Sequence, residues 1–326
     1  MSTYRQLKGY SIKSVASNPD NPQEGQVWYN STELKLKARI KIPAAWSSGP
    51  NIGTGREQVV GTGTSTAGLI AGGLSPAGTD DATEEYNGTS YSEQNDMSQS
   101  RRIGAFFGIQ TAAVFAGGFI PPAGNNVEHY GGSSWTSGGN LPSTRSSSGG
   151  AGTQTAGVIF GGFTGGPPYD GVTTTQEYDG SSWTNGGALN TARRALMGDG
   201  TQTAALAMGG DLSPGTVTGS TEEYNGSSWT EGGTMGTARY SYGSSKAGTQ
   251  SAAFAFGGLP GNLATSEKYN GSTWSADSSM ANGRGYGAGF GTQTTAVMAG
   301  GSVPPKTNIT EEYADTTEPT RSFDVS

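Results

Sequence analysis

Cysteine is absent from the 326 residues, and histidine occurs only once, at position 129. Without cysteine the chain has no disulfide, no thiolate metal site and no cysteine nucleophile. A single histidine is too little for a zinc or copper site of ordinary type, and a Ser-His-Asp arrangement is equally hard to build. We therefore expect a protein that is not an enzyme and that binds no metal ion or other cofactor.

Apolar residues are also scarce, at 32% of the chain, whereas glycine alone contributes 56 residues. The longest apolar stretch, residues 112–120, is far too short to cross a bilayer, and residues 1–10 lack the apolar core of a secretory signal. We expect no membrane insertion. The 6 Trp, 14 Tyr and 10 Phe residues recur at regular spacing, which argues against disorder and favours short strands joined by many turns.

The net charge of −7 is unevenly distributed. Residues 1–45 carry seven basic and three acidic side chains, whereas the rest of the chain carries 12 basic and 23 acidic ones. An acidic body repels phosphates, so we expect no nucleic-acid partner. A basic N-terminal segment suits an acidic partner, and a solvated charge bias without a partner is the alternative interpretation.

Three sequence markers recur in a fixed order. The first is a glycine-led stretch that ends in a double glycine, as in GTQTAALAMGG at 200–210, and the second is a Glu/Gln-x-Tyr step. The third is an aromatic residue followed ten positions later by arginine, in the six pairs Trp46/Arg56, Tyr91/Arg101, Trp135/Arg145, Trp183/Arg193, Trp229/Arg239 and Trp274/Arg284. The period of 44 to 48 residues suits a four-stranded propeller blade.

This order of double glycine, Tyr, Trp and Arg resembles the kelch repeat over residues 46–313, with Tyr91 as the one departure from Trp. The resemblance implies an all-β fold, a six-bladed kelch-like β-propeller. The double glycine is expected to end an inner strand, where side chains crowd near the axis. Pairs such as Asn225-Gly226 predict tight hairpins between outer strands.

The ends of the chain predict how the ring closes. The last repeat stops after Tyr313 without a Trp, and the missing Trp-to-Arg element stands at the front, from Trp46 to Arg56. We expect the N-terminal strand around Trp46 to complete the sixth blade, which removes an open sheet edge. Residues 314–326 are predicted to be a polar C-terminal tail.

Residues 1–45 do not match the repeat and are predicted to contain a β-hairpin around residues 30–32. The stretch NPQEGQVWYNST at 21–32 resembles a short module near the start of tailed-phage virion proteins, including those of marine phages. The resemblance implies an N-terminal anchor that docks on other virion proteins. A cover packed on the propeller is the alternative. The candidate anchor residues are Tyr4, Arg5, Leu7, Lys8, Trp28 and Tyr29.

Residues that vary between repeats are the better candidates for contact with a partner. The segment between the double glycine and the Tyr changes in length and contains prolines and aromatics, and plain loop drift is the alternative interpretation. The candidate contact residues are Phe119, Ile120, Pro121, Pro122, Pro167, Pro168, Tyr169, Asp170, Leu259 and Pro260. By contrast, the acidic residues of the Tyr step and the arginines recur in nearly every repeat, so we interpret them as structural, and His129 as a surface strand residue.

The function expected from these patterns is that of a non-enzymatic virion structural protein, made in the host cytoplasm. It would be a capsid decoration, a fibre or a tail-associated protein, with the propeller displayed toward a host glycan or receptor. Two alternatives remain open. One is a carbohydrate-binding or carbohydrate-cleaving propeller, and the other is a cellular kelch interaction adaptor.

Overall fold

The computed structural model describes residues 12–120, 123–165, 169–213, 215–303, 305–316 and 320–323. The described residues form strands without any α-helix, arranged in seven four-stranded sheets. The chain divides into two compact units, a larger one from Ala45 to Ala314 and a smaller one that combines the residues up to Ala44 with those from Asp315 onward. No helix that could span a membrane occurs within the described ranges.

Six of the seven sheets belong to the larger unit, and within each sheet the neighbouring strands run antiparallel. The first two sheets are β5 (Val60–Thr64), β6 (Ala67–Ser75), β7 (Gly78–Tyr86) and β8 (Tyr91–Glu93), then β9 (Ala105–Ile109), β10 (Ala112–Ala116), β11 (Val127–Tyr130) and β12 (Trp135–Ser137). The next two are β13 (Gly149–Thr153), β14 (Ala156–Phe160), β15 (Thr175–Tyr178) and β16 (Trp183–Asn185), then β17 (Met197–Thr201), β18 (Ala204–Ser213), β19 (Thr216–Tyr224) and β20 (Trp229–Glu231).

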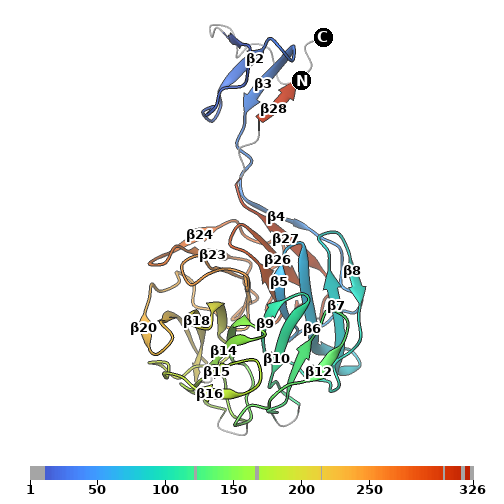
Figure 1. The fold of residues 1–326 in the computed structure, drawn as a ribbon, viewed down its shortest axis with the longest axis vertical. Coiled ribbons are helices and arrows are strands. Elements are labelled where there is room, and N and C mark those ends of the chain that lie inside the picture. The colour runs from blue at the N-terminus through green and yellow to red at the C-terminus, as the bar shows by residue number, and fades with distance from the viewer. Residues whose placement is uncertain are drawn as a thin grey trace. The chain divides into compact units, whose positions relative to one another are not determined.

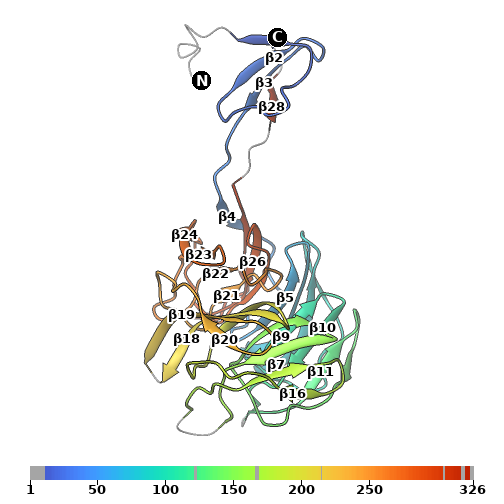
Figure 2. The same cartoon turned by 60° about the vertical axis from the view of Figure 1, so that its left-hand side comes forward.

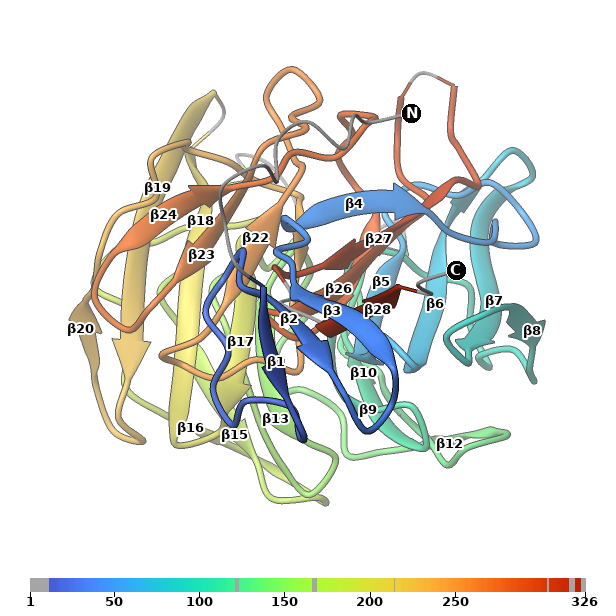
Figure 3. The ribbon, with the colours of Figure 1, turned by 90° about the horizontal axis from the view of Figure 1, so that it is seen from above.

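The fifth sheet is built from β21 (Gly243–Ser244), β22 (Phe254–Phe256), β23 (Ser266–Tyr269) and β24 (Trp274–Asp277), which follow one another outward in Figure 2. The sixth contains β25 (Ala288–Gly291), β26 (Thr295–Ala299) and β27 (Thr310–Ala314), and its outer strand is β4 (Ala45–Ser48) from the front of the chain. Tyr313 stands opposite Trp46 in this pairing, and Figure 3 shows β4 alongside β27. The strand predicted around Trp46 therefore completes the last sheet.

The first strands of the six sheets contact one another in a closed cycle, β5 to β9, β13, β17, β21, β25 and back to β5. The sheets of the larger unit surround this cycle in Figure 1, which gives a β-propeller-like arrangement. The innermost strands, such as β5, precede the two-residue turns that lead into the second strands, as at Ser65-Thr66. This corrects the expectation for the double glycine, which belongs with the second strand and not with the innermost one.

The second strand ends just before the double glycine in four sheets, and in β6 and β18 it continues past the pair with a shift in register. Glycine is required there for a steric reason. Gly72 has φ 64°, and a Cβ there would lie 2.3 Å from the carbonyl oxygen of Arg101. The first glycine of each pair meets the carbonyl of a repeat arginine in the same way. The close approach of two backbones explains why glycine recurs at this position.

The repeat arginines join each sheet to the next. All six are buried, and the guanidinium of Arg193, for example, donates to the carbonyls of Gly209 and Ser220 and pairs with Glu222 at 3.0 Å. Five arginines have such a buried carboxylate partner, in the pairs Arg56–Glu84, Arg101–Glu128, Arg193–Glu222, Arg239–Glu267 and Arg284–Glu311. In the remaining sheet Gln176 replaces the glutamate, and Arg145 bonds the carbonyls of Gly161 and Thr174.

The Tyr of the Glu/Gln-x-Tyr step makes a second bond between sheets. Tyr224 donates to Glu177 of the preceding sheet at 2.5 Å, and burial together with this carboxylate raises the pKa of Tyr224 to about 12. His129 occupies the glutamate position in one sheet, where its Nε2 lies 2.8 Å from Tyr178 Oη. The predicted strand position of His129 is confirmed by β11, and the structure adds a hydrogen bond to the next sheet. His129 is half-buried between two sheets, and burial lowers its pKa.

The smaller unit holds the seventh sheet, β1 (Lys13–Val15), β2 (Val27–Asn30), β3 (Lys35–Arg39) and β28 (Thr320–Phe323). We call this unit the terminal module. The predicted hairpin around residues 30–32 is present as β2 and β3. The predicted polar tail is corrected, because β28 pairs with β3 in antiparallel register, from Thr320 opposite Arg39 to Phe323 opposite Leu36. Backbone hydrogen bonds to an available sheet edge give this polar segment its order.

Candidate functional site

A ring of six residues surrounds one end of the axis of the larger unit. Each stands two positions after a repeat arginine and has a φ between 48° and 59°, a left-handed conformation that is unusual for residues other than glycine. The backbone N–H of one ring residue donates to the carbonyl of the previous one at 2.7 to 3.2 Å, in five successive steps. We call this set the axial ring, and its members are Gln58, Ile103, Ser147, Ala195, Ser241 and Tyr286.

The variable loops after the double glycines adjoin the axial ring. Phe119 forms a β-bridge with Arg102, and Leu259 forms one with Tyr240, so each bridge partner directly precedes a ring residue in the sequence. Phe119 and Leu259 are half-buried, and Arg102 lies over the Phe119 ring at 5.0 Å. The structure thus places these two candidate contact residues around the same end of the axis as the ring.

The other candidate contact residues have different surroundings. Tyr169 and Asp170 are exposed, and Tyr169 packs edge-on against Phe163 at 5.8 Å. Ile120 is half-buried and Pro260 is exposed. The four remaining prolines of the prediction, Pro121, Pro122, Pro167 and Pro168, lie outside the described residues.

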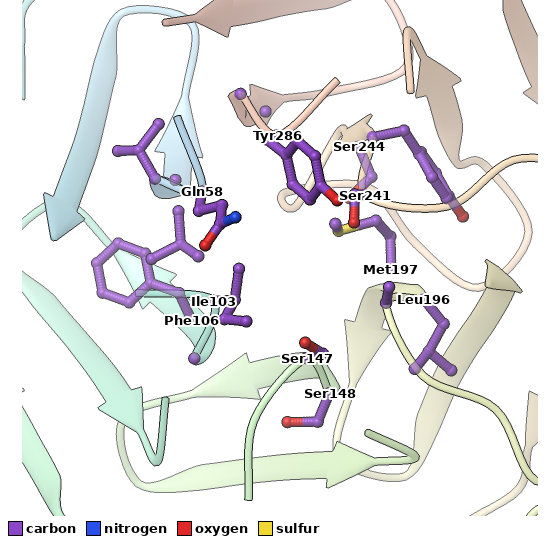
Figure 4. A pocket seen from close by; sticks show the side chains of 18 of the residues that line it. Gln58, Ile103, Phe106, Ser147, Ser148, Leu196, Met197, Ser241, Ser244 and Tyr286 are labelled. Carbon is purple, nitrogen blue, oxygen red and sulfur yellow. The ribbon is translucent and has the colours of Figure 1, made fainter. Parts of the chain in front are cut away.

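A cavity of about 60 Å³ adjoins the axial ring. Figure 4 shows ring residues from several sheets around it, with the apolar side chains of Phe106, Leu196 and Met197 and the hydroxyls of Ser148 and Ser244. Among the described residues that line it, Lys246 is the one that carries a charge. Three polar atoms of the lining are buried and have no hydrogen-bond partner within the described structure, namely Gln58 Oε1, Ser148 Oγ and Ser244 Oγ.

Lys246 reaches this cavity because the fifth repeat contains two additional residues. Six positions separate Leu196 from Gln202, whereas eight separate the corresponding Tyr242 from Gln250. The extra residues interrupt the innermost strand after β21, and Lys246 takes a φ of 57°. The following N–H, from Ala247, donates to Gly291 of the next sheet at 2.9 Å. Lys246 Nζ then lies 3.5 Å from the carbonyl of Gly150, which belongs to a sheet that is not adjacent in the ring.

A buried carboxylate lies behind the lysine. Asp199 of β17 has no exposed surface and accepts hydrogen bonds from Ser245 Oγ and, at 2.9 Å, from the N–H of Gly200. Burial raises the pKa of Asp199 to about 6, although these bonds and Lys246 favour its charged form. Burial also lowers the pKa of Lys246 to about 8, with Asp199 opposing the change. The positive charge of Lys246 in the cavity is therefore partly compensated by Asp199, which does not itself line the cavity.

Asp199, Ser245 and Lys246 were not predicted as site residues from the sequence. The signal that could have located them is the broken spacing between Tyr242 and Gln250, since the corresponding spacing is six in the other five repeats. No group of three or more acidic or histidine side chains that could hold a metal ion occurs in the part of the chain that the structure describes.

In the terminal module, the candidate anchor residue Trp28 is a core residue with no exposed surface. Its Nε1 donates to Asn18 Oδ1 at 3.3 Å, and Asn30 donates to the same oxygen at 3.0 Å. Trp28 therefore supports the module and cannot itself contact a partner, whereas Tyr29 is half-buried. The candidates Tyr4, Arg5, Leu7 and Lys8 lie outside the described residues.

Comparison with solved structures agrees with the propeller-like class defined by the sheets. The solved structure of YjhT, a propeller-like protein, superposes with a TM-score of 0.66 at 12% sequence identity, over 85% of this chain and 99% of that one. It is one of 251 solved chains that match, and a fold shared so widely does not define a function. Comparisons with protein-family descriptions and with curated proteins gave no match.

Proposed function

We propose that this chain is a six-bladed kelch-like propeller carried by a separate docking module, and that it serves as a non-enzymatic structural protein of a phage virion. In this proposal the terminal module binds another protein of the particle, and the propeller is displayed toward a host surface. The six sheets of the larger unit and the recurring Gly-Gly, Tyr, Trp and Arg markers support the kelch assignment.

The observation that carries the docking role is the surface of the terminal module. Seven large apolar side chains of the described residues are exposed, and four of them, Ile12, Leu34, Ile42 and Phe323, belong to this small unit. Leu34 is 66% exposed and has a positive φ at the tip of the β2–β3 hairpin. Exposed apolar side chains on a small basic unit suit a protein-binding surface for an acidic partner.

Two further features support the proposal. Both chain ends leave the propeller at one point, because Ala45 and Ala314 stand opposite each other in the β4–β27 pairing. A propeller held by both ends through one module is suited to display. The resemblance of residues 21–32 to tailed-phage virion proteins supports a virus particle as the larger assembly.

The test is immunogold electron microscopy with an antibody against residues 46–313, applied to particles purified from the source culture. We expect gold at a fixed site on the particles. Particles without label, with the antigen confined to the soluble fraction, would contradict the virion role.

Variants of the module test how the chain docks. Replacing Leu34 and Phe323 together by aspartate should lower incorporation into particles more than tenfold, because a lost apolar anchor typically costs about 2 kcal/mol or more. Ile109→Asp is the matched control, since Ile109 is 55% exposed but belongs to the larger unit. Equal incorporation of both variants would argue against docking through the terminal module.

A further inference from the structure

We propose that the cavity beside the axial ring is a binding site for a small carboxylate, which Lys246 holds by its ammonium group. The ligand class is a short monocarboxylate of the size of acetate, either free or as the end group of a larger molecule. This inference does not depend on the virion role, and its test is independent of any particle.

The first argument is the unused hydrogen-bonding capacity in the cavity. A lysine ammonium has three donors, and the one described hydrogen bond of Lys246 Nζ is the long 3.5 Å contact with Gly150. Its carboxylate neighbour Asp199 makes no ion pair with it within the described structure and accepts hydrogen bonds from Ser245 and Gly200. An ammonium in this state favours an anionic acceptor.

The second argument is the set of unpartnered polar atoms. Ser244 is fully buried and Ser148 is 8% exposed, and the hydroxyl oxygens of both lack any partner within the described structure. A buried hydroxyl without a partner destabilises the fold. Hydroxyls can donate to carboxylate oxygens, so a carboxylate bound by Lys246 would offer an acceptor to these serines.

The third argument is size and polarity. A water molecule needs about 10–15 Å³ of cavity volume, so a cavity of about 60 Å³ has room for about four to six non-hydrogen atoms. Acetate falls within that range. The apolar side chains of Val60, Phe106 and Met197 line the same space and suit a methyl group.

The fourth argument is that the innermost strands keep one spacing in five repeats and depart from it at this site. The two additional residues of the fifth repeat interrupt an innermost strand, and Lys246 requires a strained φ. A lysine that served only to fill the axis would not need unpartnered hydroxyls around it. Such a purely structural role is nevertheless the competing explanation, and the experiment separates the two.

The experiment measures acetate binding to the full chain by saturation-transfer NMR, with a titration to obtain Kd. We expect wild-type protein to bind acetate and Lys246→Met to bind it at least about tenfold more weakly, because a hydrogen bond to a charged group contributes about 1.5–3 kcal/mol. Lys306→Met is the matched control. Lys306 Nζ donates to the carbonyl of Ser75 at 2.9 Å outside this cavity, so its removal should leave Kd unchanged.

Two more variants distinguish the loss of the Lys246 ammonium group from general damage to the fold in Lys246→Met. Asp199→Asn removes the opposing negative charge and should strengthen acetate binding several-fold, an effect of opposite sign that damage to the fold would not produce. Ser244→Ala should weaken binding a few-fold. Absence of acetate binding to the wild-type chain, or equal Kd values for wild type and Lys246→Met, would overturn the proposal and leave Lys246 as a structural residue.

Discussion

In this protein, the residues that make contacts between sheets are nearly the same in every repeat, whereas the residues around the axis differ from one repeat to the next. Between sheets, the same bonds recur almost without change, as in the pairs Arg193–Glu222 and Arg239–Glu267. Around the axis, corresponding positions differ: the axial ring has Gln58 in the first sheet, Ile103 in the second and Tyr286 in the last. The repeated residues stabilise the fold, and the residues that differ between repeats lie around the candidate ligand site. The contrast makes three predictions, which we give from the largest effect to the smallest.

The largest effect should come from breaking a contact between sheets. Glu222→Ala leaves Arg193 buried without its carboxylate, and removal of one partner of a buried ion pair costs about 3–5 kcal/mol. We expect that loss in the free energy of unfolding, measured with chemical denaturant. Gln176→Ala is the matched control, because Arg145 already lacks a carboxylate there, and its loss should be only about 1 kcal/mol. Equal losses would show that the carboxylates do not stabilise these contacts.

A smaller effect should depend on pH and on Asp199. Its pKa rises from 3.8 to about 6 on folding, a difference of about 3 kcal/mol. Because the folded-state pKa is raised, this contribution is fully present below the unfolded pKa and is lost as pH rises through about 6. Between about pH 4 and pH 6.5, wild type should therefore lose about 2 kcal/mol of unfolding free energy relative to Asp199→Asn.

The comparison with Asp199→Asn cancels the other carboxylates, which titrate in both proteins. Lys246 has a lowered pKa of about 8, so its own contribution changes above this window. If the unfolding free energies of wild type and Asp199→Asn change in parallel from pH 4 to pH 6.5, burial does not raise the pKa of Asp199.

The smallest effect concerns the contact where the ring closes. In five repeats a glutamine donates to two carbonyls of the preceding sheet, as Gln202 does to Gly157 at 3.0 Å and Tyr178 at 2.8 Å. Ser65 takes this place in β5's turn and instead bonds Thr295 at 3.0 Å. Ser65→Gln should raise the unfolding free energy by about 1 kcal/mol. Ser65→Ala is the control, with a change within about 0.5 kcal/mol, and destabilisation by Ser65→Gln would contradict the prediction.

Much of the architecture was predictable from the sequence, because the same residue types recur at the same positions of nearly every repeat. The spacing of ten from Trp46 to Arg56 and the missing Trp after Tyr313 correctly indicated that β4 belongs to the last sheet. The innermost strands were harder to predict. Segments such as Met197–Thr201 are short and glycine-rich, and their burial comes from neighbouring sheets rather than from their own composition.

The contacts of single residues were not predictable for a different reason. The partner of His129 is Tyr178, and the partner of Arg193 is Glu222, so each contact depends on the register between two sheets. The strand β28 has no apolar pattern, and its order depends on an edge that β3 provides. Asp199 and Lys246 come together across a break in the repeat, which only the three-dimensional arrangement connects.

The closing strand also has a mechanical consequence. A load applied through the terminal module reaches the larger unit by two chain segments at once, since β4 and β27 are hydrogen-bonded neighbours and Ala45 lies opposite Ala314. A tension shared by two adjacent strands pulls both in the same direction, so it neither peels one from the other nor opens the ring at its closure. The junction that closes the ring thereby also distributes such a load over two strands.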